Sequence, residues 1–210
     1  MTDKTLEQMR SEYGLGELDV HQVGDDPLVQ FKTWLDQAIE SKALEPTAMN
    51  LATATKDGLP MCRVLLLKGL DHGLIFYGNY NSVKGQHLAE NPNACINFYW
   101  PSLERQVRIT GRVEKLPREE SVRYFKARPL ASQIGSYVSK QSQIVESRAV
   151  LDQAVEALKD VTEIDCPEHW GGYRLIPEYF EFWQGRAGRL NDRICYKPTD
   201  GGWQKNRLSP

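Results

Sequence analysis

Apolar residues along the chain follow helical spacing in a few stretches and strand-like spacing in most others. The clearest helix follows Asp26 and Pro27, a typical N-cap and first-turn pair, and its apolar positions recur every three or four residues from Leu28 to Ile39. We predict further helices over residues 82–90, 118–128 and about 144–158. The expected strands are residues 48–56, 61–70, 74–78, 94–100, 105–116, 173–183, 193–197 and 203–208.

Tight-turn sequences such as Asp57-Gly58, Asp71-His72-Gly73 and Asp200-Gly201-Gly202 separate several of these short strands. Short strands joined by tight turns indicate antiparallel pairing. The helices do not alternate regularly with the strands, as a doubly wound sheet requires, and no strand precedes Gly14-Leu15-Gly16. We therefore predict an α+β fold, mainly antiparallel β, built as a barrel with peripheral helices. Residues 1–24 are expected to form a mobile N-terminal arm, and residues 25–210 a single domain.

Composition limits the classes of partner. The chain has 210 residues and a formal net charge of −2, which gives no electrostatic basis for general nucleic-acid binding, so a cationic site must be local. Residues 1–19 are polar and acidic, without the apolar core of a signal peptide, and no apolar run approaches the roughly 20 residues of a membrane span. We expect a cytoplasmic protein that binds neither nucleic acid nor membrane.

The cysteines and histidines offer little chemistry. The four cysteines form no C-x-x-C pair, and Cys62 and Cys95 lie in apolar strand-like runs, where buried thiols are expected. The four histidines show neither metal-ligand spacing nor a nucleophile motif nearby. These observations argue against structural disulfides, zinc and a triad hydrolase.

The run from Glu181 to Arg193 carries the strongest polar pattern. Arg189, Asn191 and Arg193 alternate, so in an extended segment their side chains would share one face close to Trp183. Two guanidiniums on one short strand repel each other unless an anion or a flat ring system lies over them. A solvated strand edge guarded by charge explains the same spacing. The spacing alone leaves both interpretations open.

Other polar groups lie at predicted element ends. Arg63 and Lys68 bracket an apolar strand, and a regular strand places residues five apart on opposite faces, so they could share a ligand only across a bulge or a strand end. Ser82-Val83-Lys84 begins a helix, where free N–H groups and a lysine favour an anion. Each pattern also has an ordinary structural explanation, as polar strand ends and as a serine N-cap.

A third group surrounds the end of the helix predicted over residues 118–128. Tyr124 and Arg128 lie four residues apart on one helical face, and Ser132 follows Pro129 within reach. Two hydroxyls and a guanidinium suit a phosphate, although an amphipathic helix with a solvated arginine fits equally well. Further polar groups that suit hydrogen bonding to a heteroaromatic ring are Gln106, Arg108, Gln141 and Ser142.

Taken together, these residues resemble the pyridoxine (pyridoxamine) 5′-phosphate oxidase family, FMN enzymes that make pyridoxal 5′-phosphate. The resemblance extends from Arg10 to Pro210, and many ordered matches at matching intervals are more specific than any one motif. The segments that carry it are Arg63–Lys68, Phe76-Tyr77, Asn81–Gly85, Leu103–Val107, Tyr124–Pro129, Ser132–Gly135, Ser139–Ser142 and Glu181–Gly185.

The resemblance implies an FMN-binding split β-barrel and a homodimer with FMN at the subunit interface. It assigns the flavin site to Arg63, Lys68, Tyr77, Gly78, Val83, Lys84, Gln106, Gln141, Ser142, Trp183 and Arg193. It assigns the substrate phosphate to Lys68, Tyr124, Arg128 and Ser132. Arg189 and Asn191 would be the catalytic pair over the substrate ring, and Arg10 to Tyr13 would belong to an arm that closes over the substrate.

The implied reaction moves a hydride from C4′ of pyridoxine or pyridoxamine 5′-phosphate to flavin N5, after which O2 reoxidises the flavin and yields hydrogen peroxide. The protein would contribute position and charge. Two alternatives remain: a related split-barrel flavin oxidase acting on a phenazine precursor, and a weakly catalytic protein that binds flavin or pyridoxal phosphate. The phenazine oxidase would have little use for a complete phosphate site.

Three positions depart from the family pattern within the implied site. The family usually has His at Asn191, Arg at Val83 and Thr at Gly78. Asn cannot shuttle a proton near neutral pH, and one lost charge-assisted contact costs roughly 1.5–3 kcal/mol. We therefore expect weaker FMN retention and slower turnover than the family norm, with the fold preserved.

Overall fold

The computed structural model describes residues 5–9 and 12–210. The strands are β1 (Ala48–Ala54), β2 (Pro60–Leu66), β3 (Gly69–Leu70), β4 (Leu74–Asn79), β5 (Asn93–Trp100), β6 (Arg105–Lys115), β7 (Trp170–Gln184), β8 (Asp192–Thr199) and β9 (Gly202–Leu208). The helices are η1 (Leu6–Gln8), α1 (Pro27–Glu40), α2 (Val83–Glu90), η2 (Pro101–Leu103), α3 (Arg118–Ala127), α4 (Leu130–Val138), α5 (Arg148–Glu156) and η3 (Ala187–Arg189).

The strands belong to one sheet with the neighbour order β2-β1-β5-β6-β7-β4-β3, and β8 and β9 extend it from β7. The β3–β4, β4–β7, β7–β8 and β8–β9 ladders are antiparallel, as the turn signals predicted. The described chain divides into two compact units. Unit 1 comprises residues 1–49, 96–109 and 178–210, and unit 2 comprises residues 50–95 and 110–177.

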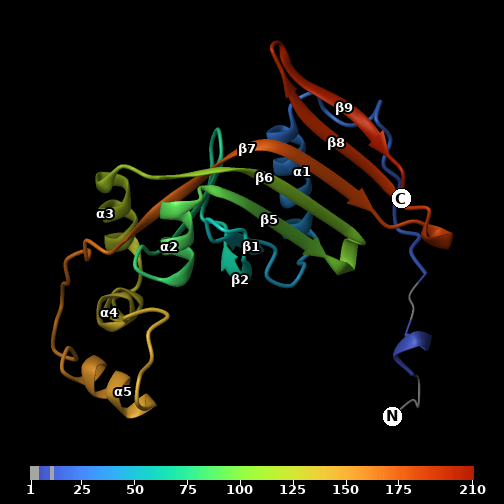
Figure 1. Ribbon diagram of the computed structural model, residues 1–210. Coiled ribbons are helices and arrows are strands. Elements are labelled where there is room, and N and C mark those ends of the chain that lie inside the picture. Colours follow the sequence, from blue (N-terminus) through green and yellow to red (C-terminus); the bar gives the residue numbers. More distant parts are fainter. Residues whose placement is uncertain (1–4, 10–11) are drawn as a thin grey trace. The chain divides into compact units, whose positions relative to one another are not determined.

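In unit 1, helix α1 covers aromatic side chains of the strands. Asp26 caps the helix by accepting a 2.8 Å hydrogen bond from Leu28 N, and Pro27 occupies its first turn, as predicted. On its apolar face, Trp34 meets Phe182 edge-on at 5.2 Å, and Phe31 meets Phe98 at 5.0 Å. Strands β8 and β9 run side by side as a hairpin whose turn pairs Thr199 with Gly202 (Figure 1).

Part of the N-terminal segment packs against the rest of unit 1. Leu18 and Val23 are each 6% exposed, and the Tyr196 hydroxyl donates a 2.8 Å hydrogen bond to the Gly24 carbonyl. These contacts bury apolar side chains that the polar composition of residues 1–24 did not reveal. The division into a mobile arm and a single domain stays a prediction.

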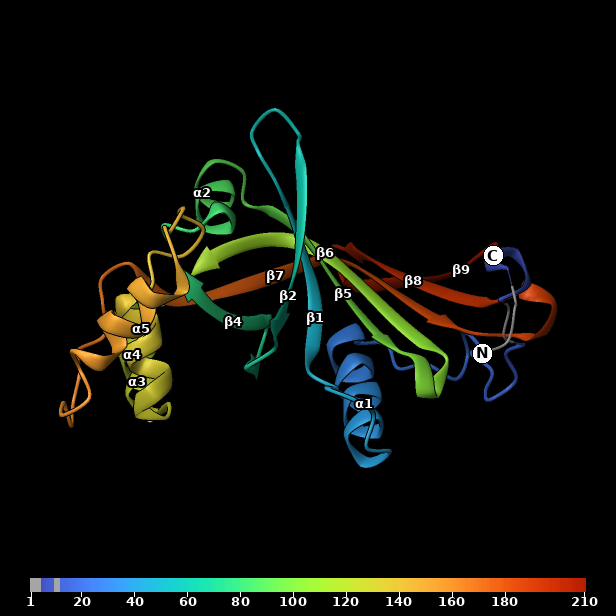
Figure 2. The ribbon, with the colours of Figure 1, turned by 90° about the horizontal axis from the view of Figure 1, so that it is seen from below.

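Unit 2 packs its helices around a small aromatic core. Phe125, Ile134, Ile164 and Trp170 form a buried cluster, and Phe125 meets Trp170 at 5.1 Å. Helix α3 supplies Phe125 and helix α4 supplies Ile134, and α5 lies next to these two helices (Figure 2). The turns at Asp57-Gly58 and Asp71-Gly73 form as predicted, with Gly58 at φ 87° and Gly73 N donating to the Asp71 carboxylate at 2.9 Å.

Several predictions about unit 2 were wrong. Helix α4 was missed, because it begins directly after Pro129 and is only nine residues long. The strand expected over residues 61–70 is two strands, since the chain leaves the ladder between Leu66 and Gly69. The thiols expected to be buried are not: Cys62 is exposed and Cys95 is half-buried. Cys62 lies on β2, which ends the neighbour order of the sheet and has no fully buried residue.

Candidate functional site

Unit 2 contains a cavity of about 320 Å³, which we call the Lys68 cavity. Two aromatic side chains from different elements form part of its wall: Tyr77 on β4 stacks on Tyr124 of α3 with 3.9 Å between ring centroids. The guanidinium carbon of Arg128 lies 4.8 Å from the ring centroid of Trp170, another lining residue. The remaining lining residues are Leu66, Lys68, Gly78, Asn79, Gly135, Ser136, Ser139 and Gln141.

The cavity presents two cations. Arg128 Nη1 donates a 2.9 Å hydrogen bond to Ser136 Oγ, and burial lowers the pKa of the guanidinium from its ordinary value. Lys68 lies just beyond β2, and it is an exposed residue that lines the cavity. Among residues 5–9 and 12–210, neither cation forms an ion pair with a carboxylate. A phosphate or carboxylate ligand would supply the missing charge.

The structure brings Lys68, Tyr124 and Arg128 together, as the predicted phosphate site requires, but Ser132 does not line the cavity. Its carbonyl accepts a 3.0 Å hydrogen bond from Ser136 Oγ one helical turn later. The side chain that meets Arg128 in the cavity is Ser136, which the sequence reasoning missed. Its i, i+4 spacing from Ser132 could have indicated it, had helix α4 been predicted.

A second concavity of about 490 Å³ in unit 2, the Arg63 groove, lies on the β2 side of the start of α2. Arg63 Nη1 donates hydrogen bonds to Thr53 Oγ1 at 2.7 Å and to the Leu51 carbonyl at 3.1 Å, so β1 fixes this guanidinium. Burial lowers the pKa of Arg63. Thr53 was also missed by the sequence reasoning. The groove residues are Met61, Cys62, Arg63, Val64, Leu65, Ser82, Val83, Lys84, Gln141 and Ser142.

Lys84 is the most buried cation at this groove, with 5% of the residue exposed. Its Nζ donates to Ser82 Oγ at 2.8 Å and to Gln141 Oε1 at 2.7 Å. Burial first, and then the charge of Arg63, lower the pKa of Lys84 to about 8. The charge of Arg63 disfavours the protonated form of Lys84, and a bound anion would relieve this repulsion.

The beginning of helix α2 lies at the same groove. Ser82 is the N-cap, as predicted, and its hydroxyl accepts from Gly85 N at 3.4 Å. The Ser142 hydroxyl accepts from Val83 N at 3.4 Å, which brings the predicted flavin residues Gln141 and Ser142 to the predicted residues Val83 and Lys84. Main-chain N–H groups and unpaired cations at one helix start are a typical phosphate-binding arrangement.

In unit 1, Arg193 belongs to a different kind of cluster. Its Nε donates to Glu181 Oε1 at 2.9 Å, and the other carboxylate oxygen of Glu181 is paired with Arg108. Burial would raise the pKa of the 3% exposed Glu181, but the hydrogen bond from Arg193 and the charge of Arg108 outweigh burial and lower it. One buried carboxylate therefore holds two guanidiniums. We call Arg108, Glu181 and Arg193 the Glu181 cluster. Arg193 is also opposite Trp183 in the β7–β8 ladder.

The expected shared face of Arg189, Asn191 and Arg193 was wrong. The segment is extended only from Asp192 onward, whereas Arg189 ends η3 with φ at 61°, directly after Gly188 at φ 63°. A non-glycine residue with positive φ is strained, and such strain is frequent at functional sites. The Arg189 side chain is exposed, and Asn191 Oδ1 accepts a 3.0 Å hydrogen bond from Arg186 N.

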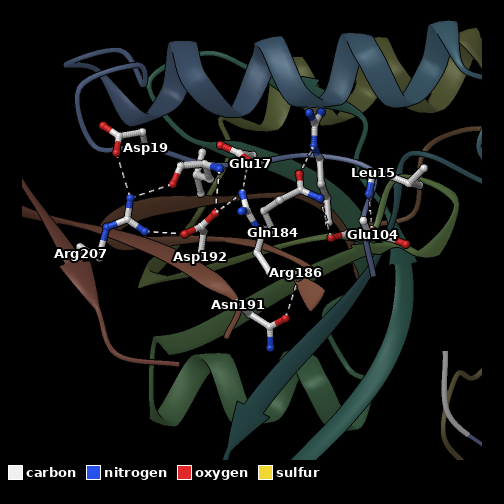
Figure 3. A network of polar contacts seen from close by, with 12 residues as sticks. Leu15, Glu17, Asp19, Glu104, Gln184, Arg186, Asn191, Asp192 and Arg207 are labelled. Carbon is white, nitrogen blue, oxygen red and sulfur yellow. Dashed lines mark hydrogen bonds and ion pairs between the residues drawn. The ribbon is translucent and has the colours of Figure 1, made fainter. Parts of the chain in front are cut away.

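A polar network connects this loop to the N-terminal segment within unit 1 (Figure 3). The Arg186 guanidinium pairs with Glu17 at 2.9 Å, and Arg207 pairs with Asp192 at 2.5 Å and with Asp19 at 3.2 Å. Asn191 lies beside this network, and its Oδ1 accepts a hydrogen bond from the backbone N–H of Arg186. Glu17 thus pairs with the loop that precedes β8, and Asp19 pairs with β9.

The aromatic part of the N-terminal segment meets β7. The Tyr13 ring meets Trp183 edge-on at 5.6 Å, and a Cβ at Gly185 would come within 2.7 Å of the Tyr13 ring, so only glycine permits this approach. Gln106 lies half-buried on β6. The predicted residue Arg10 lies outside the described residues.

Comparison with known proteins identifies the family. Residues 35–162 match the family model for pyridoxamine 5′-phosphate oxidase, and residues 170–210 match the pyridoxine 5′-phosphate oxidase C-terminal dimerisation region. The chain belongs to the pyridoxine/pyridoxamine 5′-phosphate oxidase family. It is 49% identical to a pyridoxine/pyridoxamine 5′-phosphate oxidase of Gloeothece citriformis (strain PCC 7424), with 99% of this chain and 100% of the relative covered.

A second relative, from Pseudomonas entomophila (strain L48), carries the same description and is also 49% identical, with 99% of each chain covered. The structure of PhzG from Burkholderia lata 383 in complex with tetrahydrophenazine-1-carboxylic acid has a TM-score of 0.88 and 30% identity, and the match covers 93% of this chain and 100% of that one. A pyridoxamine 5′-phosphate oxidase-related, FMN-binding protein from Nostoc punctiforme PCC 73102 has a TM-score of 0.69 at 18% identity, covering 86% of this chain and 97% of that one, and so supports the fold alone.

These comparisons confirm the predicted fold class, a mainly antiparallel split β-barrel with peripheral helices. The family is one of oxidoreductases, and it indicates FMN as the cofactor. The matching C-terminal dimerisation region indicates a homodimer. In the part of the chain that the structure describes, no helix combines the length and the apolar character needed to cross a membrane.

Proposed function

We propose that this protein is an FMN-dependent oxidase that converts pyridoxine 5′-phosphate or pyridoxamine 5′-phosphate to pyridoxal 5′-phosphate. The observation that carries the proposal is the presence of two cationic concavities in unit 2. The Lys68 cavity offers Lys68 and Arg128, and the Arg63 groove offers Arg63 and Lys84. The reaction uses two phosphorylated molecules, the cofactor and the substrate, and each would supply the counter-charge of one concavity.

The residues at the Arg63 groove fit the phosphate of FMN. Arg63 is fixed by Thr53, and the nine-tenths buried Lys84 has no described carboxylate partner. The start of α2 adds the positive end of a helix dipole. We propose that Arg63, Lys84 and Ser142 hold the cofactor phosphate, while Gln141, which lines both concavities, marks where the cofactor passes toward the Lys68 cavity. Tyr77, Gly78, Val83, Gln106, Trp183 and Arg193 complete the proposed FMN residues.

When bound, FMN supplies a hydride acceptor that O2 reoxidises with formation of hydrogen peroxide. The chain's own contribution is orientation. Arg128 and Lys68 would bind the substrate phosphate, with Ser136 holding the guanidinium of Arg128 in place. The Tyr124 hydroxyl would add a hydrogen bond, and Tyr77 supports the Tyr124 ring from behind. Fixing one end of the substrate converts a chance encounter into an oriented step. Ser132 remains a proposed substrate residue that would have to act from outside the described cavity lining.

We further propose that Arg189 and Asn191 contact the substrate ring, with Arg10 and Tyr13 closing over it. Asn191 Oδ1 is occupied by Arg186 N, so the Asn191 amide group keeps two N–H donors for a ligand. Asn191 has no group that titrates near neutral pH. A proton released by the substrate would therefore leave through another group or through water.

A second candidate function is oxidation of a phenazine precursor, because the PhzG structure with tetrahydrophenazine-1-carboxylic acid matches so much of this chain. That ligand is also an anion, so a single cationic cavity would accept it. A requirement for phosphate at the Lys68 cavity separates the two candidates. The third possibility, binding of flavin or pyridoxal phosphate with little catalysis, predicts retention of ligands without turnover.

One assay tests these alternatives. FMN-loaded protein is mixed with pyridoxine 5′-phosphate, pyridoxamine 5′-phosphate or tetrahydrophenazine-1-carboxylic acid, and hydrogen peroxide is measured together with the pyridoxal 5′-phosphate absorbance. We expect peroxide and aldehyde in equal amounts from either phosphorylated pyridine. Peroxide from the phenazine compound alone would support the second candidate, and tight binding of pyridoxal 5′-phosphate without peroxide would support the third.

A further inference from the structure

A carboxylate far away in sequence holds two backbone N–H groups of the N-terminal segment. Glu104 follows η2, and its Oε2 accepts hydrogen bonds from Gly14 N at 2.8 Å and from Leu15 N at 2.9 Å (Figure 3). These bonds join residues that are 90 and 89 positions apart. Hydrogen bonds to an ionised acceptor are stronger than bonds to a neutral one. The Glu104 side chain is therefore a specific attachment point for this segment.

The main chain of Glu104 is bonded to the end of β7. Its carbonyl accepts a 2.8 Å hydrogen bond from Gly185 N and a 3.3 Å bond from Gln184 Nε2. Gln184 is itself close to the N-terminal segment, because a Cβ built on Gly16 would come within 3.2 Å of its side chain. Glu104 thus contacts the segment through its side chain and the end of β7 through its backbone.

Glu104 has a backbone conformation that glutamate rarely adopts. Its φ of 53° and ψ of 38° lie in the left-handed region. Glycine adopts this region without strain, and asparagine adopts it more readily than other residues with a side chain. The turn by itself gives no reason for a glutamate. What glutamate adds is a carboxylate that reaches Gly14 and Leu15.

Tyr13 immediately precedes the two N–H groups that Glu104 holds. Its ring meets Trp183 edge-on at 5.6 Å, and a Cβ built on Gly185 would come within 2.7 Å of the ring. Because Tyr13 is covalently joined to Gly14, the bond from Gly14 to Glu104 restricts where the ring can lie. Glu104 therefore bonds to the chain on both sides of the contact between Tyr13 and Gly185.

We infer that Glu104 is a positioning residue for Tyr13: its carboxylate holds the N-terminal segment at the end of β7 and keeps the Tyr13 ring against Trp183. The closing of Tyr13 over the substrate rests on the proposed function, whereas the effect of Glu104 on the segment does not. A segment that is already held in place loses less conformational freedom when it closes over a ligand. Glu104 should therefore strengthen substrate binding without contacting the substrate.

Glu104→Gly tests the first part of this inference, because glycine keeps the left-handed turn and removes the carboxylate. Exchange of the Gly14 and Leu15 amide hydrogens with D2O is followed by NMR in the purified protein. We expect exchange at both amides to accelerate roughly tenfold, a typical effect of losing a charge-assisted hydrogen bond. The exchange of core amides should stay the same, since the change is local.

Steady-state kinetics of FMN-loaded protein tests the second part. We expect Glu104→Gly to raise KM for pyridoxine 5′-phosphate roughly fivefold and to change kcat by less than about twofold, because binding is weakened in the ground state and the transition state alike. In a Tyr13→Ala background, the same substitution should change KM by less than about twofold, since Tyr13 carries the effect.

The matched control is Glu45→Gly, at an exposed glutamate of unit 1 that also has a left-handed φ, 45°. It should leave KM and the exchange of the Gly14 and Leu15 amides unchanged. Denaturant unfolding checks that each variant is folded. Glu104→Gln keeps the length of the side chain and removes its charge, so it serves as the second variant if Glu104→Gly is unstable, with smaller effects in the same direction.

Three results would overturn the inference. Unchanged exchange at Gly14 and Leu15 in Glu104→Gly would show that the carboxylate does not hold the segment. Faster exchange with an unchanged KM would show that holding the segment does not serve substrate binding. An equal rise of KM in the Tyr13→Ala background would show that Glu104 acts by another route. Should the unsubstituted protein fail to oxidise pyridoxine 5′-phosphate, the proposed function is wrong, but the exchange measurement still decides whether Glu104 holds the segment.

Discussion

The Glu181 cluster in unit 1 and the Arg63 groove in unit 2 each bring two cations together, but only the Glu181 cluster contains the matching negative charge. Arg108 and Arg193 share the buried carboxylate of Glu181. Arg63 and Lys84 have only hydroxyl, amide and carbonyl oxygens as described partners. The first arrangement is electrostatically complete, and the second would be completed by an anion from outside the chain.

Unit 2 itself shows that this difference is not a general lack of carboxylates. Arg174, whose side chain is 10% exposed, pairs with Asp71 at 2.6 Å and with Glu114 at 3.1 Å. A buried arginine with a structural task is thus neutralised in the same unit that leaves Arg63, Lys84 and Arg128 without carboxylates. Arg63, Lys84 and Arg128 all line one of the two concavities. This coincidence favours phosphate binding over a solvated surface.

The largest expected effect comes from removing the negative charge of the complete cluster. Glu181→Gln leaves two guanidiniums without their shared carboxylate, and breaking a buried pair costs about 3–5 kcal/mol. Because the Arg108 side chain is 44% exposed, we expect the free energy of unfolding to fall by about 3 kcal/mol at neutral pH, at the low end of that range. Denaturant unfolding of FMN-free protein measures this loss of stability. Glu178→Gln, at an exposed residue of β7, is the control.

The same variant has a pH signature. The pKa of Glu181 is lowered in the folded protein, so its stabilisation is present above the ordinary pKa of a glutamate and is lost as the pH falls through the lowered value. The stability of the unsubstituted protein should therefore fall more steeply in acid than that of Glu181→Gln. Equal stability of the two proteins at neutral pH would contradict the view of this cluster as a structural pair.

Removing a cation from the Lys68 cavity should affect catalysis and leave stability nearly unchanged. Arg128→Met keeps much of the side-chain volume but removes the charge, so we expect kcat/KM for pyridoxine 5′-phosphate to fall roughly 10- to 100-fold. FMN affinity should stay the same, because the groove residues are untouched. Steady-state kinetics and a flavin titration on the same preparation separate the two effects. A comparable loss of FMN binding would show that the two concavities do not serve separate ligands.

Adding a cation to the Arg63 groove should strengthen FMN binding. Val83 lines the groove at the first residue of α2, so Val83→Arg supplies another guanidinium near the proposed phosphate. We expect FMN binding to tighten by about tenfold, the equivalent of one modest charge-assisted contact. Val83→Leu changes size without charge and should leave affinity near that of the unsubstituted protein. Equal affinities for Val83→Arg and Val83→Leu would argue against an anion at this position.

The smallest expected effect is at Asn191. Asn191→His introduces a group that titrates near neutral pH beside Arg189, so turnover should rise by a factor of about three and the kcat profile should gain an ionisation between roughly pH 6 and 8. Rapid-reaction measurement of flavin reduction under anaerobic conditions isolates this step from reoxidation. An unchanged rate at every pH would mean that residue 191 has no part in proton movement.

Much of the fold could be predicted because its signals are local. Asp26 and Pro27 start α1, Ser82 caps α2, and glycine-containing turns separate the antiparallel strands. What could not be predicted depends on residues far apart in sequence. Glu181 and Arg108 are 73 positions apart, and the buried Leu18 has a backbone N–H that donates to Asp192, 174 positions away. The exposure of Cys62 likewise follows from its strand's place at the end of the sheet order.

The residues of the candidate site also divide into those that local spacing could predict and those that it could not. Tyr124 and Arg128 line one cavity, although Arg128 follows the end of α3 in an extended conformation and does not continue the helix. Ser136 was missed together with helix α4. The alternation of Arg189, Asn191 and Arg193 was misleading, because Gly188 and Arg189 adopt positive φ values that period-two spacing cannot reveal.

The central claim is that unit 2 binds two phosphates with two separate sets of cations. Phosphorus-31 NMR of the protein with FMN and pyridoxal 5′-phosphate tests it most directly, since each phosphate gives its own bound signal. We predict that Lys84→Met shifts or releases the FMN signal alone and that Arg128→Met shifts or releases the pyridoxal 5′-phosphate signal alone. If both substitutions affect both signals equally, or if neither affects any, the assignment of the two concavities is contradicted.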